Sequence, residues 1–155
     1  MKITLLVVGK TSTGYLTQGI EEYVKRVQRY VPFDIRVIPD VKRNQGPQRQ
    51  KELEGEAMLS TITGADYVTL LDERGTQLTS REFAQDIDKK MVQLPSRWIL
   101  VIGGPYGFSQ AMYDRANSKL SLSKMTFPHE MVRLFVVEQI YRAMTILHGE
   151  PYHHD

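Results

Sequence analysis

The feature that most constrains this chain is an uninterrupted apolar run that ends in a glycine loop. Residues 98–102 read WILVI and residues 103–107 read GGPYG. An apolar run without polar alternation is typical of a strand that is buried on both faces of a sheet. Glycines let a ligand approach the backbone, and the open crevice of an α/β sheet lies beyond the carboxyl ends of its strands. The loop at 103–107 is therefore the first candidate for a binding site.

A second loop with binding chemistry follows at residues 123–129, which read SKMTFPH. Pro128 suits the first turn of a helix, and Thr126 is a plausible capping residue nearby. Two loops of this kind could hold a flat ligand between them, mostly through backbone groups. Ordinary turns remain the alternative, because strand-to-helix connections carry Gly, Ser and Pro whether or not they bind anything.

Several well-known motifs are missing from these loops. The spacing in GGPYG does not give G-x-G-x-x-G, and no Lys-Ser or Lys-Thr follows it. The sequence also lacks G-x-S-x-G, and His129-Glu130 is followed by Met-Val-Arg, which does not complete H-E-x-x-H. A dinucleotide fingerprint, a P-loop, a hydrolase elbow and a zinc-protease helix are therefore not supported.

The rest of the chain alternates between strand and helix patterns. Strands are expected at 2–9, 33–38, 67–71 and 97–102, and helices at 15–30, 52–62, 80–92 and 109–117. This alternation predicts an α/β fold with a mostly parallel sheet and helices on both faces. Since no repeat or linker divides the chain, residues 1–155 are expected to form a single domain.

The last helix, predicted over 128–147, is apolar around much of its circumference. A helix that covers only one sheet needs a single apolar stripe, so this helix needs a second partner. A second copy of the chain, packed as a two-fold dimer, would supply it. The alternative is that one domain wraps the helix from both sides.

Composition narrows the class of protein. The 155 residues contain no cysteine, which agrees with a reducing compartment and excludes a thiolate metal site. The formal net charge is +2. No signal peptide or membrane span is recognisable, so a soluble, cytoplasmic protein is expected. The mild charge permits RNA binding through a local patch, but it is also ordinary for an enzyme of small molecules.

Four longer strings place the chain in a known family. They are VIGGPYGFS at 101–109, LSLSKMTFPHEMVR at 120–133, VVEQIYRA at 136–143 and GEPYHHD at 149–155. Together with MKITLLVVGK at the start, they closely resemble the RlmH family of SPOUT-superfamily methyltransferases, which modify a pseudouridine of large-subunit (23S) ribosomal RNA. The resemblance extends over essentially the whole chain.

The resemblance implies a carboxyl-terminal trefoil knot that binds S-adenosylmethionine, a homodimer, and 23S ribosomal RNA or the assembled ribosome as partner. Carried over by motif, the cofactor-binding residues are Leu70, Gly103, Leu122, Ser123, Lys124, Met125, Thr126 and Phe127. It also favours RNA contact by the basic segment 40–51, which could otherwise be a solvated loop. The RNA-binding candidates are Lys42, Arg43, Arg49, Lys51 and Arg133.

Methylation at N3 of a pseudouridine requires that nitrogen to lose a proton, so the protein must align the reactants and assist deprotonation. The catalytic candidates are His129, Glu138, Arg142, Tyr152 and His153. Most of these residues also have a non-catalytic explanation. Glu138 and Arg142 have the i,i+4 spacing of an ordinary surface pair, and final residues are often disordered. A zinc site built from His148, His153, His154 and Asp155 is weakly supported, and no metal is expected.

Two other functions remain open at this stage: a non-catalytic RNA-binding or ribosome-associated domain, and a small-molecule α/β enzyme that binds a nucleotide. The leading hypothesis makes a specific structural prediction. Because the tail leaves the last helix near the expected dimer interface, Tyr152 and His153 of one chain should complete a site in which Gly103 and Met125 of the other chain hold the cofactor.

Overall fold

The computed structural model describes residues 1–41, 46–94 and 96–155. Its described strands form one sheet in the order β2-β1-β4-β3-β5, and all four neighbouring pairs are parallel. The strands are β1 (Lys2–Val8), β2 (Phe33–Ile38), β3 (Tyr67–Gln77), β4 (Arg97–Ile102) and β5 (Ser118–Ser121). The expected α/β fold with a parallel sheet is confirmed.

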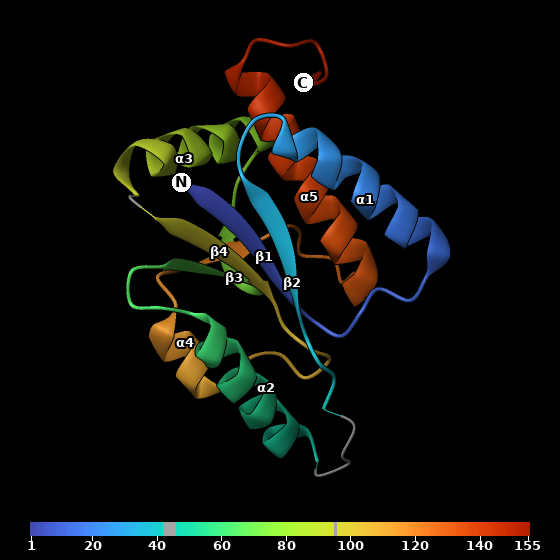
Figure 1. The fold of residues 1–155 in the computed structure, drawn as a ribbon, viewed down its shortest axis with the longest axis vertical. Coiled ribbons are helices and arrows are strands. Elements are labelled where there is room, and N and C mark those ends of the chain that lie inside the picture. The colour runs from blue at the N-terminus through green and yellow to red at the C-terminus, as the bar shows by residue number, and fades with distance from the viewer. Residues whose placement is uncertain (42–45, 95) are drawn as a thin grey trace.

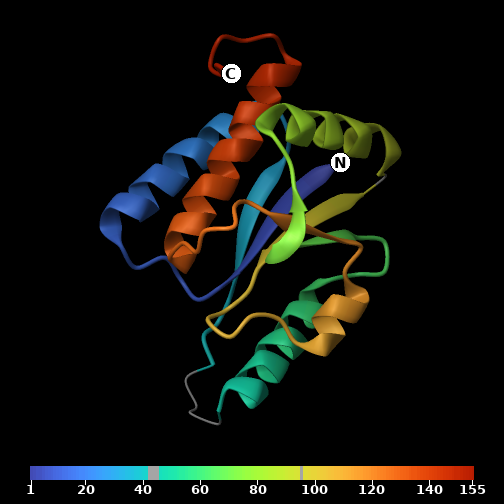
Figure 2. The same ribbon diagram turned by 180° about the vertical axis from the view of Figure 1, so that it is seen from behind.

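Helices cover both faces of the sheet, as Figures 1 and 2 show. One face carries α1 (Gly14–Gln28), α3 (Ser80–Gln93) and α5 (His129–Leu147), and the other carries α2 (Pro47–Thr61) and α4 (Gln110–Arg115). None of the helices in the described ranges is both long and apolar enough to cross a lipid bilayer.

The central strands explain this layering, because their successive side chains point to opposite faces. In β1, Leu5 joins the core under α1, α3 and α5, whereas Leu6 joins the core under α2 and α4. In β4, Leu100 and Val101 divide in the same way, and all four side chains are essentially inaccessible to solvent. The apolar run of the sequence is thus a strand buried on both faces.

Helix α5 lies between α1 and α3 on the sheet (Figure 1). Its residues Val137, Ile140 and Met144 are buried within the single chain. One domain therefore wraps most of this helix, and its apolar circumference alone does not require a second copy. Phe135, which is 39% exposed, is the large apolar side chain of α5 that remains at the surface.

Three elements differ clearly from the sequence-based expectation: β3 continues to Gln77, six residues beyond the predicted end at Leu71, and the other two are α2 and β5. Helix α2 begins at Pro47, five residues earlier than predicted, because Gly46 takes a positive φ of 88° and Pro47 occupies the first turn. Arg49 and Lys51 consequently lie on a helix and not in a loop. Strand β5 was not predicted, since it is only four residues long and half of those are serine.

At Gly75 the backbones of β3 and β5 approach each other closely. Strand β3 changes register between Leu71 and Thr76, and its second half continues to pair with β5. A Cβ atom at Gly75 would lie 2.7 Å from the backbone nitrogen of Leu120. Only glycine fits this approach, which brings the end of β5 beside the carboxyl ends of β3 and β4.

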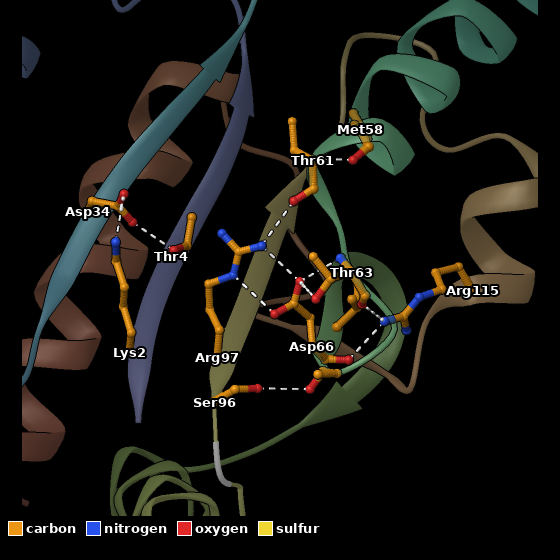
Figure 3. Close-up of polar contacts among 12 residues, drawn as sticks. Lys2, Thr4, Asp34, Met58, Thr61, Thr63, Asp66, Ser96, Arg97 and Arg115 are labelled. Atoms are coloured by element: carbon orange, nitrogen blue, oxygen red, sulfur yellow. Dashed lines mark hydrogen bonds and ion pairs between the residues drawn. The ribbon is translucent and has the colours of Figure 1, made fainter.

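A polar clamp closes the opposite end of the sheet, where β3 and β4 begin (Figure 3). Asp66 accepts hydrogen bonds from Arg97 at 3.1 and 2.8 Å and from the backbone of Thr63 at 2.7 Å. Arg97 also donates to the carbonyl of Thr61, and Arg115 donates to the carbonyls of Thr63 and Asp66. The clamp ties the ends of α2 and α4 to the sheet.

Candidate functional site

A pocket of about 670 Å³ opens at the carboxyl ends of β3 and β4. The glycine loop that follows β4 forms one wall and the loop that follows β5 forms another. The candidates that line the pocket are Gly103, Leu122, Ser123, Met125, Thr126, Phe127 and His129. The two loops that the sequence singled out thus converge on one cavity, whose volume suits a small organic ligand.

Leu70 and Lys124 are not among the residues that line this pocket. The side chain of Leu70 is fully buried in the core, and its neighbour Leu71 is the residue that borders the pocket. Lys124 is exposed between Ser123 and Met125 but is not itself part of the lining. Contact between the Leu70 side chain and a ligand is not favoured by this placement.

Local hydrogen bonds shape both loops. In the glycine loop, Gly107 has a φ of 84° and donates its backbone N–H to the carbonyl of Gly104 at 3.1 Å. In the second loop, the Ser123 hydroxyl accepts from the backbone of Met125 at 3.0 Å, and Ser121 donates to the carbonyl of Ser123. The Met125 side chain remains 76% exposed. Bent loops of this kind present backbone groups and one free apolar side chain to a ligand.

Glu54, which sequence reasoning missed, supports the glycine loop from α2. Its side chain is 1% exposed, and a Cβ atom at Gly104 would lie 2.4 Å from its Oε1 atom. Oε2 accepts a hydrogen bond from Gln50, whereas Oε1 has no partner among the described residues. Burial raises the pKa of Glu54 above its ordinary value. The carboxyl group explains why residue 104 is a glycine.

Asp72, Arg74 and Tyr113 also line the pocket and were not among the candidates. The Tyr113 hydroxyl donates to Asp72 and accepts from Arg74 at 2.7 Å. Burial alone would raise the pKa of Asp72, but hydrogen bonds from Tyr113 and from the backbone of Arg74 outweigh it and lower that pKa. A signal existed in the sequence, because Asp72 and Arg74 directly follow the predicted strand 67–71.

The carboxyl-terminal candidates form a second cluster at the far end of α5. The Tyr152 hydroxyl donates to Glu138 at 3.1 Å and lies 3.1 Å from the hydroxyl of Tyr23. Glu138 also pairs with Arg142 at 2.7 Å. Burial, together with the hydrogen bonds to Tyr23 and Glu138, raises the pKa of Tyr152 well above its ordinary range. Glu138 and Arg142 therefore belong to a partly buried network and are not an isolated surface pair.

The same cluster fixes the orientation of His153. Arg142 lies 3.1 Å from Nδ1 of His153, and Asp155 lies 2.9 Å from Nε2. Since a guanidinium group can only donate, Nδ1 must accept and Nε2 must carry the proton. Arg81 of α3 binds Asp155 at 2.7 Å. No group of three His, Cys, Asp or Glu side chains in the described ranges is arranged to hold a metal ion.

The pocket and the tail cluster are separate within one chain. His129 lines the pocket, whereas Arg142 follows it by thirteen residues on the same helix. At 1.5 Å per residue, these two positions are roughly 20 Å apart along the axis of α5. The structure thus brings Glu138, Arg142, Tyr152 and His153 together but leaves His129 with the pocket.

The RNA-binding candidates are dispersed. Lys51 lines the pocket, and Arg49 pairs with Glu52 at 3.3 Å on the exposed face of α2. Lys42 and Arg43 lie outside the described residues. Arg133 is only 4% exposed; it donates to the carbonyl of Val8 at 2.6 Å and to Thr11 at 3.0 Å. Its geometry favours a structural role, in which it holds the end of β1 against α5.

Comparison with known proteins bears on this site. Residues 1–153 match the family model described as "Predicted SPOUT methyltransferase". The chain is 53% identical to the ribosomal RNA large subunit methyltransferase H of Parabacteroides distasonis and 50% identical to that of Bacteroides fragilis, with full coverage of each protein.

The fold has a more distant counterpart among solved structures. The structure titled "a probable methylase family protein from Haemophilus influenzae Rd KW20" superposes with a TM-score of 0.53 at 12% identity, over 95% of this chain and 66% of the other. That likeness concerns the fold alone, whereas the full-length matches identify close relatives. The chain belongs to the SPOUT methyltransferases and, among them, to the ribosomal RNA large subunit methyltransferase H family.

Proposed function

We propose that this protein is an S-adenosylmethionine-dependent methyltransferase that acts on N3 of a pseudouridine in 23S ribosomal RNA. The observation that carries the proposal is the full-length identity of about one half with relatives that are named as large-subunit rRNA methyltransferases. The convergence of two binding loops on one pocket supports it. Such an enzyme would work in the cytoplasm, on the ribosome or on its free RNA.

The pocket residues fit the cofactor. Gly103 and Gly104 leave room for a bent ligand to lie against the backbone, and Leu122 and Phe127 supply apolar walls. The loop at 122–127 would hold the adenine through backbone groups, with Met125 covering it. The bound cofactor supplies a methyl group on a sulfonium centre that needs no further activation. The side chains of the protein then have to position the base and take up its proton.

The tail cluster has the groups for this second task. Glu138 can accept a proton, and Arg142 and the Nε2–H group of His153 can stabilise the negative charge that develops on the uracil ring. The Tyr152 and His153 rings can also stack on a base. Because Arg142 lies about 20 Å from His129 along α5, and the tail with Tyr152 and His153 follows the carboxyl end of that helix, we place this cluster in the active site of a second copy.

We therefore propose a homodimer in which Tyr152 and His153 of one chain complete the pocket of the other. The apolar surface at the start of α5 supports this interface. Phe127 and Phe135 stack edge to face with centroids 5.2 Å apart, and Leu122, Met125 and Phe135 are all exposed. An apolar patch of this kind beside a pocket is a typical protein-contact surface.

We also propose that the chain carries the trefoil knot of the SPOUT fold. The support is topological: β5 lies at one edge of the sheet beside β3, yet α5, which follows it, lies between α1 and α3. Figure 2 lets the reader follow the segment that joins them past the connection between β3 and α3. A crossing of this kind departs from the ordinary rules of chain connection.

Two measurements test the activity. Calorimetry should detect binding of S-adenosylmethionine by the folded protein, and labelled methyl groups should appear at one pseudouridine of 23S RNA when the protein is added to ribosomes from cells that lack it. Absence of cofactor binding would contradict the proposal that the protein is an S-adenosylmethionine-dependent enzyme. Cofactor-independent RNA binding without methyl transfer would instead identify a non-catalytic ribosome-associated domain.

Mixing two variants tests the shared site. Truncation after Glu150 should leave dimerisation and cofactor affinity intact but abolish methyl transfer. A full-length Gly103→Trp variant should lose cofactor binding and be inactive alone. If each site uses both chains, heterodimers of the two variants should recover part of the activity. If heterodimers form but stay inactive, the site lies within one subunit.

A further inference from the structure

Arg74 is exposed at the rim of the pocket and yet is held in one place. Its side chain is 72% exposed. Its guanidinium group donates to the Tyr113 hydroxyl at 2.7 Å, lies 5.4 Å from the centroid of the Tyr113 ring, and lies 3.6 Å from Asp72. An exposed arginine normally samples many rotamers, so this restraint has an entropic cost. Stabilisation of the fold does not explain why an exposed arginine side chain is restrained in this way.

The side chains around Arg74 form a small network. The nearly buried carboxylate of Asp72 accepts a hydrogen bond from the Tyr113 hydroxyl, which leaves a lone pair of the phenolic oxygen free to accept from Arg74. This hydrogen bond uses one of the five guanidinium donors. Lys119 of β5 places its ammonium group 5.8 Å from the centroid of the same ring. Two cations thus surround Tyr113, with Asp72 as the buried counter-charge and Glu73 next in the chain.

We propose that Arg74 binds a phosphate of the RNA strand that carries the target nucleotide, an assignment that rests on the proposed function. The planar guanidinium fork matches phosphate oxygens, and a cation that is already restrained loses less freedom when it binds. The exposure of Arg74 at the rim favours an anion outside the pocket. Phosphates flanking an inserted base lie in that position and fix its register.

A salt titration measures this contact directly. Binding of a 23S RNA fragment that contains the target pseudouridine should be measured at several salt concentrations, in the presence of the demethylated product of S-adenosylmethionine. Arg74→Ala should weaken binding about tenfold and reduce the slope of log K against log salt by about one. Tyr113→Phe keeps the charge but removes both hydroxyl contacts, so it should weaken binding a few-fold with an unchanged slope.

Matched variants separate the possible outcomes. Lys89→Ala, which removes an exposed positive charge from the second half of α3, should change neither affinity nor slope. An unchanged slope in Arg74→Ala overturns the proposal. Weaker cofactor binding by calorimetry, with unchanged RNA binding, would assign Arg74 to the cofactor carboxylate. If the unaltered protein itself binds the RNA without salt dependence, both Arg74 and the proposed function are wrong.

Discussion

The two ends of the sheet are built on opposite principles. At the amino ends of β3 and β4, Asp66 and Arg97 are largely buried, and their charged atoms are met by partners within the chain. At the carboxyl ends, Glu54 keeps an oxygen without a partner in the described part of the chain, and Met125 and Arg74 face solvent. The charged groups at one end are paired within the fold, whereas the other end exposes groups that a ligand could contact.

This contrast shows how a small domain can carry a site without losing its stability. Polar groups whose hydrogen bonds are all satisfied can hold helices to a sheet. Unpaired polar groups and exposed apolar side chains cost stability unless a ligand or partner covers them. The same chemistry therefore has different consequences at the two ends. Variants of the buried clamp at the amino end should change unfolding, and variants of the exposed side chains at the carboxyl end should change binding.

The largest effect is expected for Arg97→Ala. This variant leaves Asp66 buried, 3% exposed in its side chain, without its counter-charge. Breaking a buried pair in this way should lower the free energy of unfolding by about 3 kcal/mol, measured by chemical denaturation. Arg49→Ala, which breaks an exposed pair with Glu52, should cost less than about 1 kcal/mol. Equal losses of unfolding free energy in the two variants would refute the stabilising role of the clamp.

A smaller loss is expected for Gly75→Ala, at the junction of β3 and β5. The new methyl group would lie 2.7 Å from backbone atoms of Leu120, which cannot move aside as a flexible side chain could. Overpacking of this kind should cost about 2 kcal/mol and displace the loop after β5, so cofactor affinity should fall as well. Gly64→Ala, which meets no atom within 4 Å, is the control and should be close to neutral.

Lowering the pH should reduce the contribution of the clamp to the free energy of unfolding, by less than the two preceding variants do. Burial alone would raise the pKa of Asp66, but hydrogen bonds from Arg97 and Thr63 outweigh it, so the folded pKa lies below the ordinary value. A lowered folded pKa contributes stability above the unfolded pKa of about 3.9, which is lost as the pH falls through the folded pKa. The stability difference between the unaltered protein and Asp66→Asn should therefore shrink below about pH 4. A pH-independent difference would show that ionisation of Asp66 is not involved.

The smallest effect on folding is expected at the carboxyl end. Met125→Ala should change the free energy of unfolding by no more than about 0.5 kcal/mol, because the side chain is 76% exposed. It should nevertheless weaken cofactor binding about tenfold in calorimetry, a loss of ~1.4 kcal/mol. Val92→Ala removes another exposed apolar side chain, from α3, and should change neither quantity. A large loss of stability in Met125→Ala would contradict the division between the two ends.

The layers of the fold were predictable because they depend on apolar patterning along continuous segments. Residues 98–102 could hardly be anything but a central strand. The end of β3 was not predictable, since its bend depends on a contact between Gly75 and a strand 45 residues later. Strand β5 was missed for the same reason, because its pairing with β3 and not its own composition makes it a strand.

The candidate site was predictable only in part. Glycine and serine loops after strands indicated the pocket, and a family resemblance added the tail residues. Burial could not be seen: Arg133 resembled a surface cation, yet it closes the end of β1 from inside the domain. Glu54 belongs to none of the motifs recognised in the sequence, and only the fold places its carboxyl group against Gly104.

The position of α5 between α1 and α3 has a consequence for how the protein is made. Residues 129–155 are synthesised last, yet α5 fills the groove formed by Val27, Ala84 and Ile87 and the sheet beneath them. At translation rates of about 5–20 residues per second, this groove stays open for roughly one to five seconds while the final segment is translated. Each nascent chain therefore exposes the apolar surface under α5 beside the ribosome until its last helix is released.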